Sequence, residues 1–306
     1  MIHTVTVNPA LDLTYRLGEL VFDDKLRARE VFRAPGGNGV NVSRVAARLG
    51  HPTVAMGFAG GRAGEEMVER LAAESVRAWF THQGSETRTN VILQDDAGRQ
   101  LRVSSPGGAG RLEEVEKLYA SIFDLRAPDF LVLTGSLLEG MPEDFYLRVL
   151  ERARSEGVRI VADIDRELLE LVRAGVDLIK PNSHELSRLT GMPVGTPAEA
   201  LAAARRALGL GCPLVVASLG AQGALLVSAD EAWHALPPEV RVDSAVGAGD
   251  SLLAGVLVAL AEGRELPEVL RLGVACGTAT ATTSGTELCQ LETVQAILPQ
   301  VRLERL

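Results

Sequence analysis

Short apolar runs alternate along the chain with amphipathic stretches of helical length, and this alternation constrains the fold more than any other feature of the sequence. We predict strands at residues 2–7, 53–58, 130–134, 159–163, 178–180, 214–218 and 224–227. We predict helices between them at residues 40–49, 64–74, 113–123, 143–156 and 197–208. Strands that are apolar along their whole length are buried on both faces, so helices must cover both sides of a parallel sheet. The pattern therefore predicts an α/β fold.

Length and composition are those of a soluble globular enzyme. A chain of 306 residues forms one large domain, or a large domain with a small one. Apolar residues make up 46% and charged residues 23%, which are ordinary values. The net charge of −9 disfavours nucleic acid as the main partner, because no basic stripe exists to meet a phosphate backbone. The longest apolar run is far shorter than the roughly 20 residues that span a bilayer, so we expect no membrane partner.

Cysteine usage and the first residues both indicate the cytoplasm. Cys212, Cys276 and Cys289 are odd in number and widely spaced, which is typical of neither a disulfide framework nor a zinc site. Buried thiols of this kind fit a reducing cytosol. The N-terminal residues have neither the basic region nor the long apolar region of a signal peptide. We therefore expect a cytoplasmic protein.

Two segments interrupt the alternation of strands and helices. Residues 13–34 are polar and extended, without a helical period. Residues 89–104 have the pattern of a hairpin, with a turn at 95–98 between two alternating runs. Together they predict a small sheet that projects from the main domain and closes over a site at the strand ends, where α/β sheets bind ligands. The alternative is decoration at the sheet edge.

The motif with the clearest chemistry is Val246-Gly247-Ala248-Gly249-Asp250-Ser251, which precedes an apolar run at residues 252–261. A glycine turn at a helix N-terminus offers unpaired N–H groups and a positive dipole end, both of which attract phosphate. A carboxylate placed there would repel the anion unless it accepts a proton from an attacking hydroxyl. The alternative role for Asp250 is that of a helix N-cap.

A second glycine-rich motif, Gly36-Gly37-Asn38-Gly39-Val40-Asn41-Val42, opens the first long helix. Its glycines let a ligand approach the backbone closely, and its alternative role is a tight turn with an N-cap. Val42 stands where the third glycine of a dinucleotide fingerprint belongs, which disfavours a nucleotide-linked dehydrogenase. The sequence also contains no P-loop motif.

Two further motifs follow predicted strands. In Lys180-Pro181-Asn182-Ser183-His184-Glu185, side-chain oxygens three residues apart at a helix start suit Mg²⁺ and its waters. The alternative there is helix capping by Asn182 or Ser183. Ser218-Leu219-Gly220-Ala221-Gln222-Gly223 has a glycine turn suited to a nucleotide, with a plain hairpin turn as the alternative. Asp12 follows the first strand and could hold sugar hydroxyls or cap a loop.

Taken together and in this order, these motifs resemble the PfkB-type carbohydrate kinases of the ribokinase-like superfamily over essentially the whole chain. The resemblance implies a ribokinase-like three-layer α/β sandwich with a mainly parallel central sheet and a small β-sheet lid. It further implies a single kinase domain over residues 1–306, with the lid at about 12–34 and 88–104 within it. ATP and Mg²⁺ are the implied cofactors.

Within that family, residues 4–12, 87–90 and 134–137 are similar to the branch that phosphorylates sugar phosphates. Lys25-Leu26-Arg27 and residues 285–289 resemble the minor 6-phosphofructokinase. Asn38 stands where fructose-1-phosphate and tagatose-6-phosphate kinases usually carry lysine, although the 6-phosphofructokinase has glycine there. The resemblance thus favours conversion of fructose 6-phosphate to fructose 1,6-bisphosphate. A 1-phosphofructokinase or tagatose-6-phosphate kinase, and a non-catalytic sugar-phosphate or nucleotide sensor, remain as alternatives.

The resemblance also implies a role for each candidate residue. Asp250 is the expected base, and the N–H groups of Gly247, Ala248 and Gly249 are expected to stabilise the transferring phosphoryl group. The residues expected to bind the sugar phosphate are Asp12, Lys25, Arg27, Gly37, Asn38, Asn41, Arg88, Asn90 and Ser136. The nucleotide is expected at Lys180, Ser218, Gly220, Gly223 and Gly249, and the metal at Asn182 and Glu185.

The family's lid often pairs with that of a second subunit. A homodimer through the lid sheets is therefore implied, with Lys25 or Arg27 acting across the interface. Related enzymes often use a monovalent cation beside the loop that contains Gly247. Here Asp243-Ser244-Ala245 replaces the Asp-Thr-Thr of ribokinase, so the sequence leaves a K⁺ requirement open.

Overall fold

The computed structural model describes residues 1–126 and 128–306. Its large sheet has the order β14-β13-β12-β11-β10-β9-β8-β1-β4-β5. The strands are β1 Ile2–Thr6, β4 Thr53–Ala59, β5 Arg77–His82, β8 Phe130–Thr134, β9 Arg159–Asp163, β10 Leu178–Ile179, β11 Leu214–Ser218, β12 Ala224–Val227, β13 Ala232–Leu236 and β14 Arg302–Arg305. Neighbouring strands are parallel from β5 to β11 and antiparallel from β11 to β14. The predicted mainly parallel sheet is confirmed.

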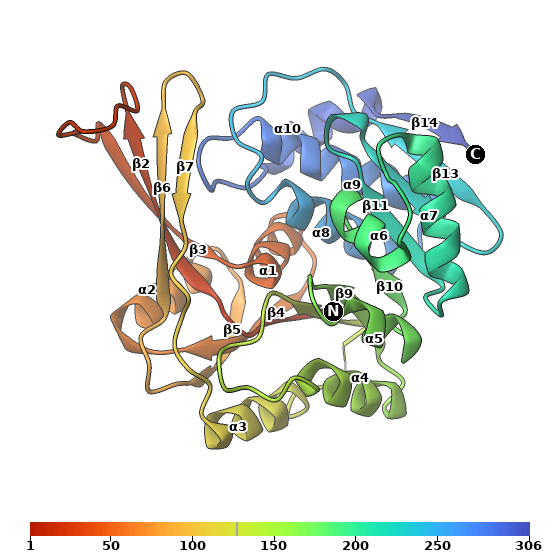
Figure 1. Cartoon of the computed structure of the whole chain (residues 1–306), viewed down its shortest axis with the longest axis horizontal. Helices are drawn as coiled ribbons and strands as arrows, with labels where there is room; N and C mark the ends of the chain where they lie inside the picture. Colours follow the sequence, from red (N-terminus) through yellow and green to blue (C-terminus); the bar gives the residue numbers. More distant parts are fainter. Residues whose placement is uncertain (127) are drawn as a thin grey trace.

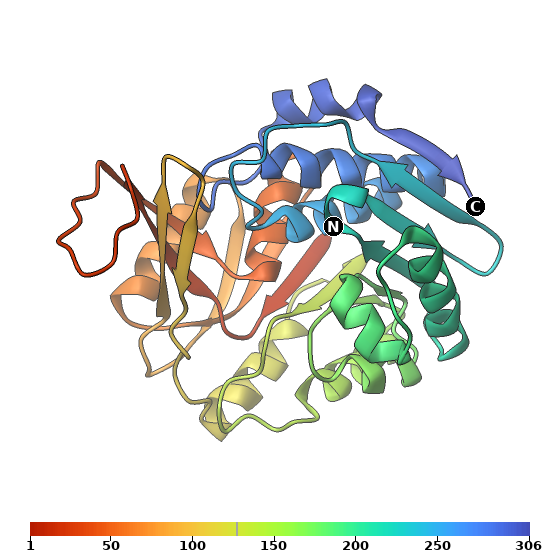
Figure 2. The ribbon, with the colours of Figure 1, turned by 45° about the horizontal axis from the view of Figure 1, so that its top comes forward.

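Helices cover both faces of this sheet (Figures 1 and 2). They are α1 Asn38–Arg48, α2 Gly61–Ala73, α3 Leu112–Ile122, α4 Phe145–Ser155, α5 Leu168–Arg173, α6 Ser183–Thr190, α7 Pro197–Gly209, α8 Ala248–Ala261, α9 Leu266–Ala281 and α10 Leu291–Ile297. One apolar core joins the sheet to α3–α7, and another joins it to α1 and α8–α10. This is the three-layer arrangement expected when strands are buried on both sides.

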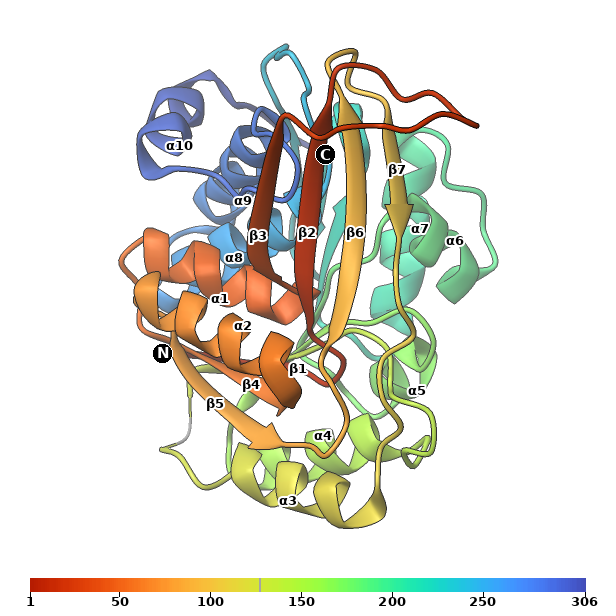
Figure 3. The ribbon, with the colours of Figure 1, turned by 90° about the vertical axis from the view of Figure 1, so that its left-hand side faces the viewer.

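A smaller sheet with the order β3-β2-β6-β7 stands apart from the large one, as Figure 3 shows. Its strands are β2 Ala10–Leu17, β3 Glu30–Gly36, β6 Arg88–Asp95 and β7 Gln100–Val103. The predicted hairpin is confirmed, because β6 and β7 pair antiparallel. The polar stretch at residues 13–34 supplies most of β2 and β3, which pair antiparallel. The extended conformation predicted for it is therefore confirmed.

The small sheet has two chemically different faces. Residues paired across neighbouring strands share a face, because successive side chains alternate along each strand. Its inner face carries Asp12, Thr14, Asn90, Ile92 and Gln94. Its outer face carries Leu13, Tyr15, Val31, Val91, Leu93, Leu101 and Val103. These inner residues are buried or half-buried, although Phe32 and Arg102 on the same face are exposed, and the outer residues are half-buried or exposed.

Several elements escaped prediction. The edge strands β5 and β14 are largely exposed, so they lack the continuous apolar run by which the inner strands were identified. The helix α9 was also missed, and it packs on α8 in the core. No helix within the described residues is long and apolar enough to cross a membrane. The three cysteines are buried thiols, as predicted.

Candidate active site

The turn before α8 has the geometry expected of a phosphate-binding loop. Gly247 is the N-cap residue of α8 and adopts the left-handed conformation, with φ +75°. A Cβ atom there would lie 2.6 Å from Leu288 Cδ2, so glycine is required for both conformation and space. Asp250 lies in the first helical turn, and Gly247 provides no side-chain cap. The alternative role of Asp250 as N-cap is therefore wrong.

The Asp250 carboxylate is buried and held by α1. Asn41 Nδ2 donates a hydrogen bond of 2.8 Å to Asp250 Oδ2. The pKa of Asp250 is raised to about 7, chiefly by burial and next by the nearby Asp163 carboxylate, while the Asn41 hydrogen bond and Lys180 act in the opposite direction. A carboxylate with a pKa near neutrality is suited to accept a proton from a hydroxyl at physiological pH.

A buried arginine orients Asn41. Arg44 Nη1 lies 3.5 Å from Asn41 Oδ1, which leaves the Asn41 amide NH₂ group to donate to Asp250. The same guanidinium is fixed by two hydrogen bonds to Glu74, of 2.8 and 2.9 Å, and one of 2.9 Å to the carbonyl of Pro35. The sequence analysis missed both charged residues. Arg44 is three residues after Asn41, so helical spacing could have placed it on the same helix face.

Lys180 lies against the turn before α8. Its Nζ atom is 3.1 Å from Asp163 Oδ1, and both side chains are 7% exposed. A Cβ atom on Gly249 would be 3.4 Å from the same Nζ atom. Burial alone would lower the pKa of Lys180, but the surrounding carboxylates outweigh burial and raise it. The ammonium group is therefore positively charged at the N-terminus of α8.

The sequence analysis also missed Asp163, which is the last residue of β9. Its second carboxylate oxygen, Oδ2, is buried and has no hydrogen-bond partner within the described part of the chain. The signal for this residue was available, because the carboxyl ends of parallel strands meet at one edge of the sheet. A buried carboxylate oxygen without a donor is well suited to a cation.

The predicted metal residues form a capping box at the start of α6. Asn182 Oδ1 accepts hydrogen bonds from the N–H groups of His184 and Glu185, and Glu185 Oε2 accepts one of 2.9 Å from the N–H of Asn182. Burial raises the pKa of Glu185. No cluster of three or more acidic, His or Cys ligands occurs in the described ranges. Capping is thus what these side chains do here, and their metal role stays a prediction.

Three predicted substrate residues lie together at the base of the small sheet. Asn90 Nδ2 donates a 2.8 Å hydrogen bond to Asp12 Oδ1. A Cβ atom on Gly36 would lie 2.4 Å from Asp12 Oδ2, so the absence of a side chain at Gly36 leaves room for this carboxylate. Arg88 Nη1 donates to the carbonyl of Ser105 at 3.2 Å, while its Nε atom is buried without a partner among the described residues. The Arg88 guanidinium therefore retains donors for an anion.

The start of α1 is held by threonines from two strands. The N–H of Gly39 donates to Thr134 Oγ1 at 2.9 Å, and that of Val40 donates to Thr6 Oγ1 at 3.1 Å. Gly37, the N-cap residue, has φ +111°, and Asn38 follows it with an exposed side chain. The two threonines thus fix the helix end that carries Asn41.

The predicted nucleotide residues divide into two groups. Ser218 pairs with Asn182 in a parallel bridge, which brings it beside the Lys180 segment. Gly220 is exposed in the turn that follows. Gly223 has a structural reason to be glycine, because a Cβ atom there would lie 1.9 Å from the carbonyl oxygen of Ala235.

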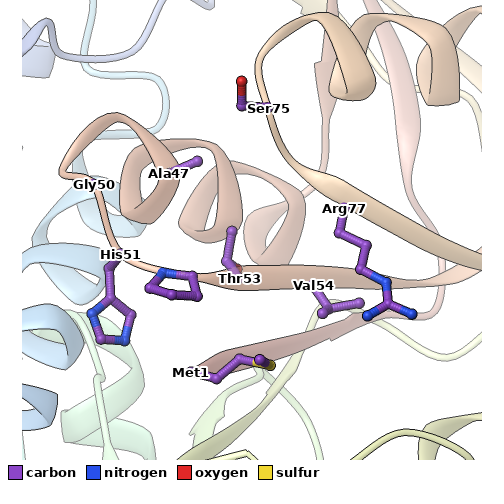
Figure 4. A pocket seen from close by; sticks show the side chains of 9 residues that line it. Met1, Ala47, Gly50, His51, Thr53, Val54, Ser75 and Arg77 are labelled. Carbon is purple, nitrogen blue, oxygen red and sulfur yellow. The ribbon is translucent and has the colours of Figure 1, made fainter.

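The remaining predicted substrate residues all have exposed side chains. Lys25 and Arg27 are exposed in the loop between β2 and β3, and Ser136 is exposed after β8. A surface hollow of about 350 Å³ lies elsewhere, at the opposite ends of the strands (Figure 4). Met1, Thr53 and Arg77 line it, and it contains none of the predicted site residues.

Comparisons with known proteins identify a family and relatives of this chain. The family pattern described as pfkB family carbohydrate kinase matches residues 6–294. The chain is 35% identical over 300 residues to the ATP-dependent 6-phosphofructokinase isozyme 2 of Escherichia coli (strain K12), covering 97% of both chains. It is 33% identical over 307 residues to the 1-phosphofructokinase of Bacillus subtilis (strain 168), covering 100% of both.

The same fold is found in crystal structures. Phosphofructokinase-2 from E. coli in complex with substrates and products matches with a TM-score of 0.93 and 34% identity, over 98% of both chains. Two further structures of that enzyme cover 98% of both chains. One is described as a complex with potassium, at TM-score 0.92 and 34% identity. The other is described as a tetrameric inhibited form, at TM-score 0.90 and 33% identity.

Proposed function

Because the chain belongs to the PfkB family of carbohydrate kinases and is an ATP-dependent sugar-phosphate kinase of the phosphofructokinase type, we propose that its substrate is fructose 6-phosphate. The product is then fructose 1,6-bisphosphate. The observation that carries the catalytic assignment is the Asp250 carboxylate, buried at the N-terminus of α8 with a pKa of about 7. The names of the two relatives point to different fructose phosphates, so similarity alone does not identify the sugar. The choice of fructose 6-phosphate therefore rests on Lys25-Leu26-Arg27 and on Asn38.

In this proposal Asp250 accepts the proton of the attacking sugar hydroxyl. The hydroxyl oxygen forms a bond to the γ-phosphorus of ATP, the bond to the bridging β–γ oxygen breaks, and ADP leaves. The N–H groups of Gly247, Ala248 and Gly249 stabilise charge on the transferring group, and the Lys180 ammonium lies beside them. Loss of one such donor typically raises a barrier by about 3–4 kcal/mol.

Mg²⁺ fits the carboxylates beside Lys180. The unpartnered Oδ2 atom of Asp163 and the second oxygen of Glu185 are hard oxygen ligands of the kind that Mg²⁺ takes together with water. Asn182 positions Glu185 through the capping box. When bound, the metal ion would neutralise charge on the ATP phosphates. Ser218 and Gly220 line the nucleotide in this arrangement.

We further propose that the small sheet is a lid within a single kinase domain. Asp12, Asn41 and Asn90 then hold sugar hydroxyls, and Gly37 and Asn38 border them. Arg88 binds the existing phosphate, since it retains donors and a planar fork suits a phosphate. Ser136 completes this group from the end of β8.

The outer face of the small sheet supports the proposed dimer. It is mainly apolar, although Arg33 also lies on it, and Val31 and Val103 are 51% and 56% exposed there. An apolar sheet face of this kind is suited to pair with the same face of a second copy. Lys25 and Arg27 are exposed in the loop between β2 and β3, which fits a role across that interface.

The test is ADP release from Mg-ATP with fructose 6-phosphate, fructose 1-phosphate and tagatose 6-phosphate, compared by kcat/KM. We expect the highest value for fructose 6-phosphate. A preference for fructose 1-phosphate would mean that Asn38 does not exclude that sugar. Binding of a sugar phosphate without turnover would favour the non-catalytic sensor. The matched control is Asp250→Asn, for which we expect a loss of several orders of magnitude with nucleotide binding kept.

A further inference from the structure

Gln94 connects the small sheet to the rest of the molecule through its side-chain amide. It lies on the inner face of β6 and is 1% exposed. Its Nε2 atom donates a hydrogen bond of 3.2 Å to the carbonyl of Asp243, and its Oε1 atom accepts one of 2.8 Å from the N–H of Gly285. Both ends of one buried amide are therefore bound to backbone groups of the main body.

The two loops that Gln94 bridges are joined to each other. Ser244 Oγ donates to the carbonyl of Gly285 at 2.7 Å, and Ser284 Oγ donates to Asp243 Oδ2 at 2.5 Å. The N–H of Asp243 also donates to the carbonyl of Ala281 at 2.9 Å. Figures 1 and 2 show these loops, before α8 and after α9, beside the small sheet. They form a single unit, which we call the loop pair (residues 243–246 and 284–288).

The loop pair also fixes the position of residues 247–249, which we call the catalytic turn because they directly precede Asp250. Residues 243–246 continue directly into Gly247, the N-cap of α8. From the other loop, Leu288 packs where a Cβ atom of Gly247 would be, at 2.6 Å. A second strand of the small sheet touches the same unit, because a Cβ atom on Gly285 would lie 2.8 Å from Thr14 Cγ2. Any movement of the small sheet is thus transmitted to the turn before Asp250.

We propose that Gln94 is a positioning residue that locks the small sheet to the catalytic turn, so that the sugar held by the sheet and the base held by α8 keep one relative position. The proposal rests on the proposed function, since it concerns alignment for phosphoryl transfer. The sheet carries Asp12 and Asn90, while the turn carries Asp250. These groups sit on different bodies, and the Gln94 amide is a hydrogen-bonded link between them.

Alignment of this kind affects the chemical step more than binding. Displacement of reacting groups by about 1 Å typically costs on the order of 100-fold in rate. Gln94→Met keeps the length and apolar stem of the side chain but removes both hydrogen bonds. Gln94→Glu keeps an acceptor for Gly285 and places a second acceptor against the Asp243 carbonyl. Gln100→Met is the matched control, because Gln100 pairs with Gln94 across the hairpin and its amide bonds only to Arg102 among the contacts described.

The experiment measures kcat, KM and amide hydrogen exchange for the three variants. For Gln94→Met we expect kcat to fall about 10- to 100-fold, with KM for Mg-ATP within about twofold of wild type. We expect faster exchange at residues 243–249 and 284–288 only in the two Gln94 variants. Gln100→Met should match wild type in all three measurements. If Gln94→Met fails to fold, Gln94→Glu decides the matter by the same measurements.

Three results would overturn the proposal. The first is wild-type kcat in a folded Gln94 variant, and the second is unchanged exchange in residues 243–249. The third is equal losses in Gln94→Met and Gln100→Met, which would leave Gln94 a role in sheet stability only. Failure of this proposal can be distinguished from failure of the proposed function. If the wild-type protein shows no turnover, hydrogen exchange still shows whether Gln94 holds the small sheet to the loop pair.

Discussion

At the scale of single residues, the structure concentrates charge around one lysine. The carboxylates of Asp163, Glu185 and Asp250 all act on Lys180, and each lies at the carboxyl edge of the sheet or at a helix start beside it. Like charges held this close, in buried surroundings, shift pKa values toward neutrality. The same shift that makes Asp250 a usable base at pH 7 also makes it costly to keep ionised in the folded state.

The raised pKa of Asp250 gives a prediction with a definite sign. The pKa is about 7 in the folded protein against 3.8 as reference, so the folded state binds more protons between these values. Stability contributed by this group therefore falls as pH rises through that window. We expect kcat/KM to fall below about pH 7, and Asp250→Asn to melt higher than wild type at pH 8 but not at pH 4. Melting curves that shift equally at both pH values would contradict this.

The pair of Lys180 and Asp163 gives a second prediction. Breaking a buried ion pair by removing one partner costs about 3–5 kcal/mol, because the other charge stays buried and uncompensated. Lys180→Met should therefore unfold at lower denaturant concentration than wild type. The double variant Lys180→Met with Asp163→Asn should regain most of that stability without regaining turnover. A double variant as unstable as Lys180→Met would show that packing, not charge, explains the loss.

At the scale of elements, the site is made where strand ends meet helix starts. The ends of β1 and β8 hold α1 through Thr6 and Thr134, and α1 in turn holds the carboxylate of α8 through Asn41. A helix start is positive and a buried strand end is rigid, so polar side chains there are both oriented and polarised. The α6 capping box does the same for Glu185.

The double duty of Glu185, capping and metal binding, can be separated by mutation. Gln at this position can still accept the N–H of Asn182, so Glu185→Gln should keep the capping box and melt like wild type. Glu185→Ala loses the reciprocal hydrogen bond to the N–H of Asn182, while the Asn182 cap remains, at a cost of about 1 kcal/mol. Both variants should need more Mg²⁺ for half-maximal rate. The measurement is rate against free Mg²⁺ at fixed ATP, and wild-type Mg²⁺ dependence in Glu185→Gln would leave capping as its only role.

The parts of this site that the sequence predicted are those with local patterns. Glycine turns next to apolar runs identified the starts of α1 and α8, and the hairpin pattern identified β6 and β7. Gln94 and Glu74 carry no such pattern, because their partners are distant in sequence and become neighbours only in the fold. The Asn182 and Glu185 spacing fits a cap and a metal site equally well, so the sequence could not distinguish them.

At the scale of the whole molecule, each chain of the proposed dimer completes the site of the other. Lys25 and Arg27 are exposed in a loop at the end of the small sheet, and the adjoining outer face is apolar. The inner face, by contrast, carries Asp12 and Asn90. The inner face of such a sheet can cover a site while its apolar outer face pairs with a second copy. Pairing of this kind would bring the β2–β3 loop of each copy toward the site of the other.

This arrangement predicts what happens when the outer face is made polar. Val31→Glu with Val103→Glu places charges on two exposed apolar positions, so the stability of each chain should change by no more than about 0.5 kcal/mol per site. The mass in sedimentation should fall from that of a dimer to that of a monomer. The KM for the sugar phosphate should rise while Mg-ATP binding stays unchanged, because in the proposed dimer only the sugar's phosphate is bound by both chains.

The control is Leu112→Glu, which alters an exposed apolar residue at the start of α3, a helix that lies at the other end of the molecule from the loop between β2 and β3 in Figure 3. It should leave both mass and KM as in wild type. Lys25→Ala and Arg27→Ala complete the argument, because they should raise the KM for the sugar phosphate without changing mass. A wild-type chain that sediments as a monomer at full activity would place the phosphate contacts within one chain, and Arg88 and Ser136 would then have to bind it unaided.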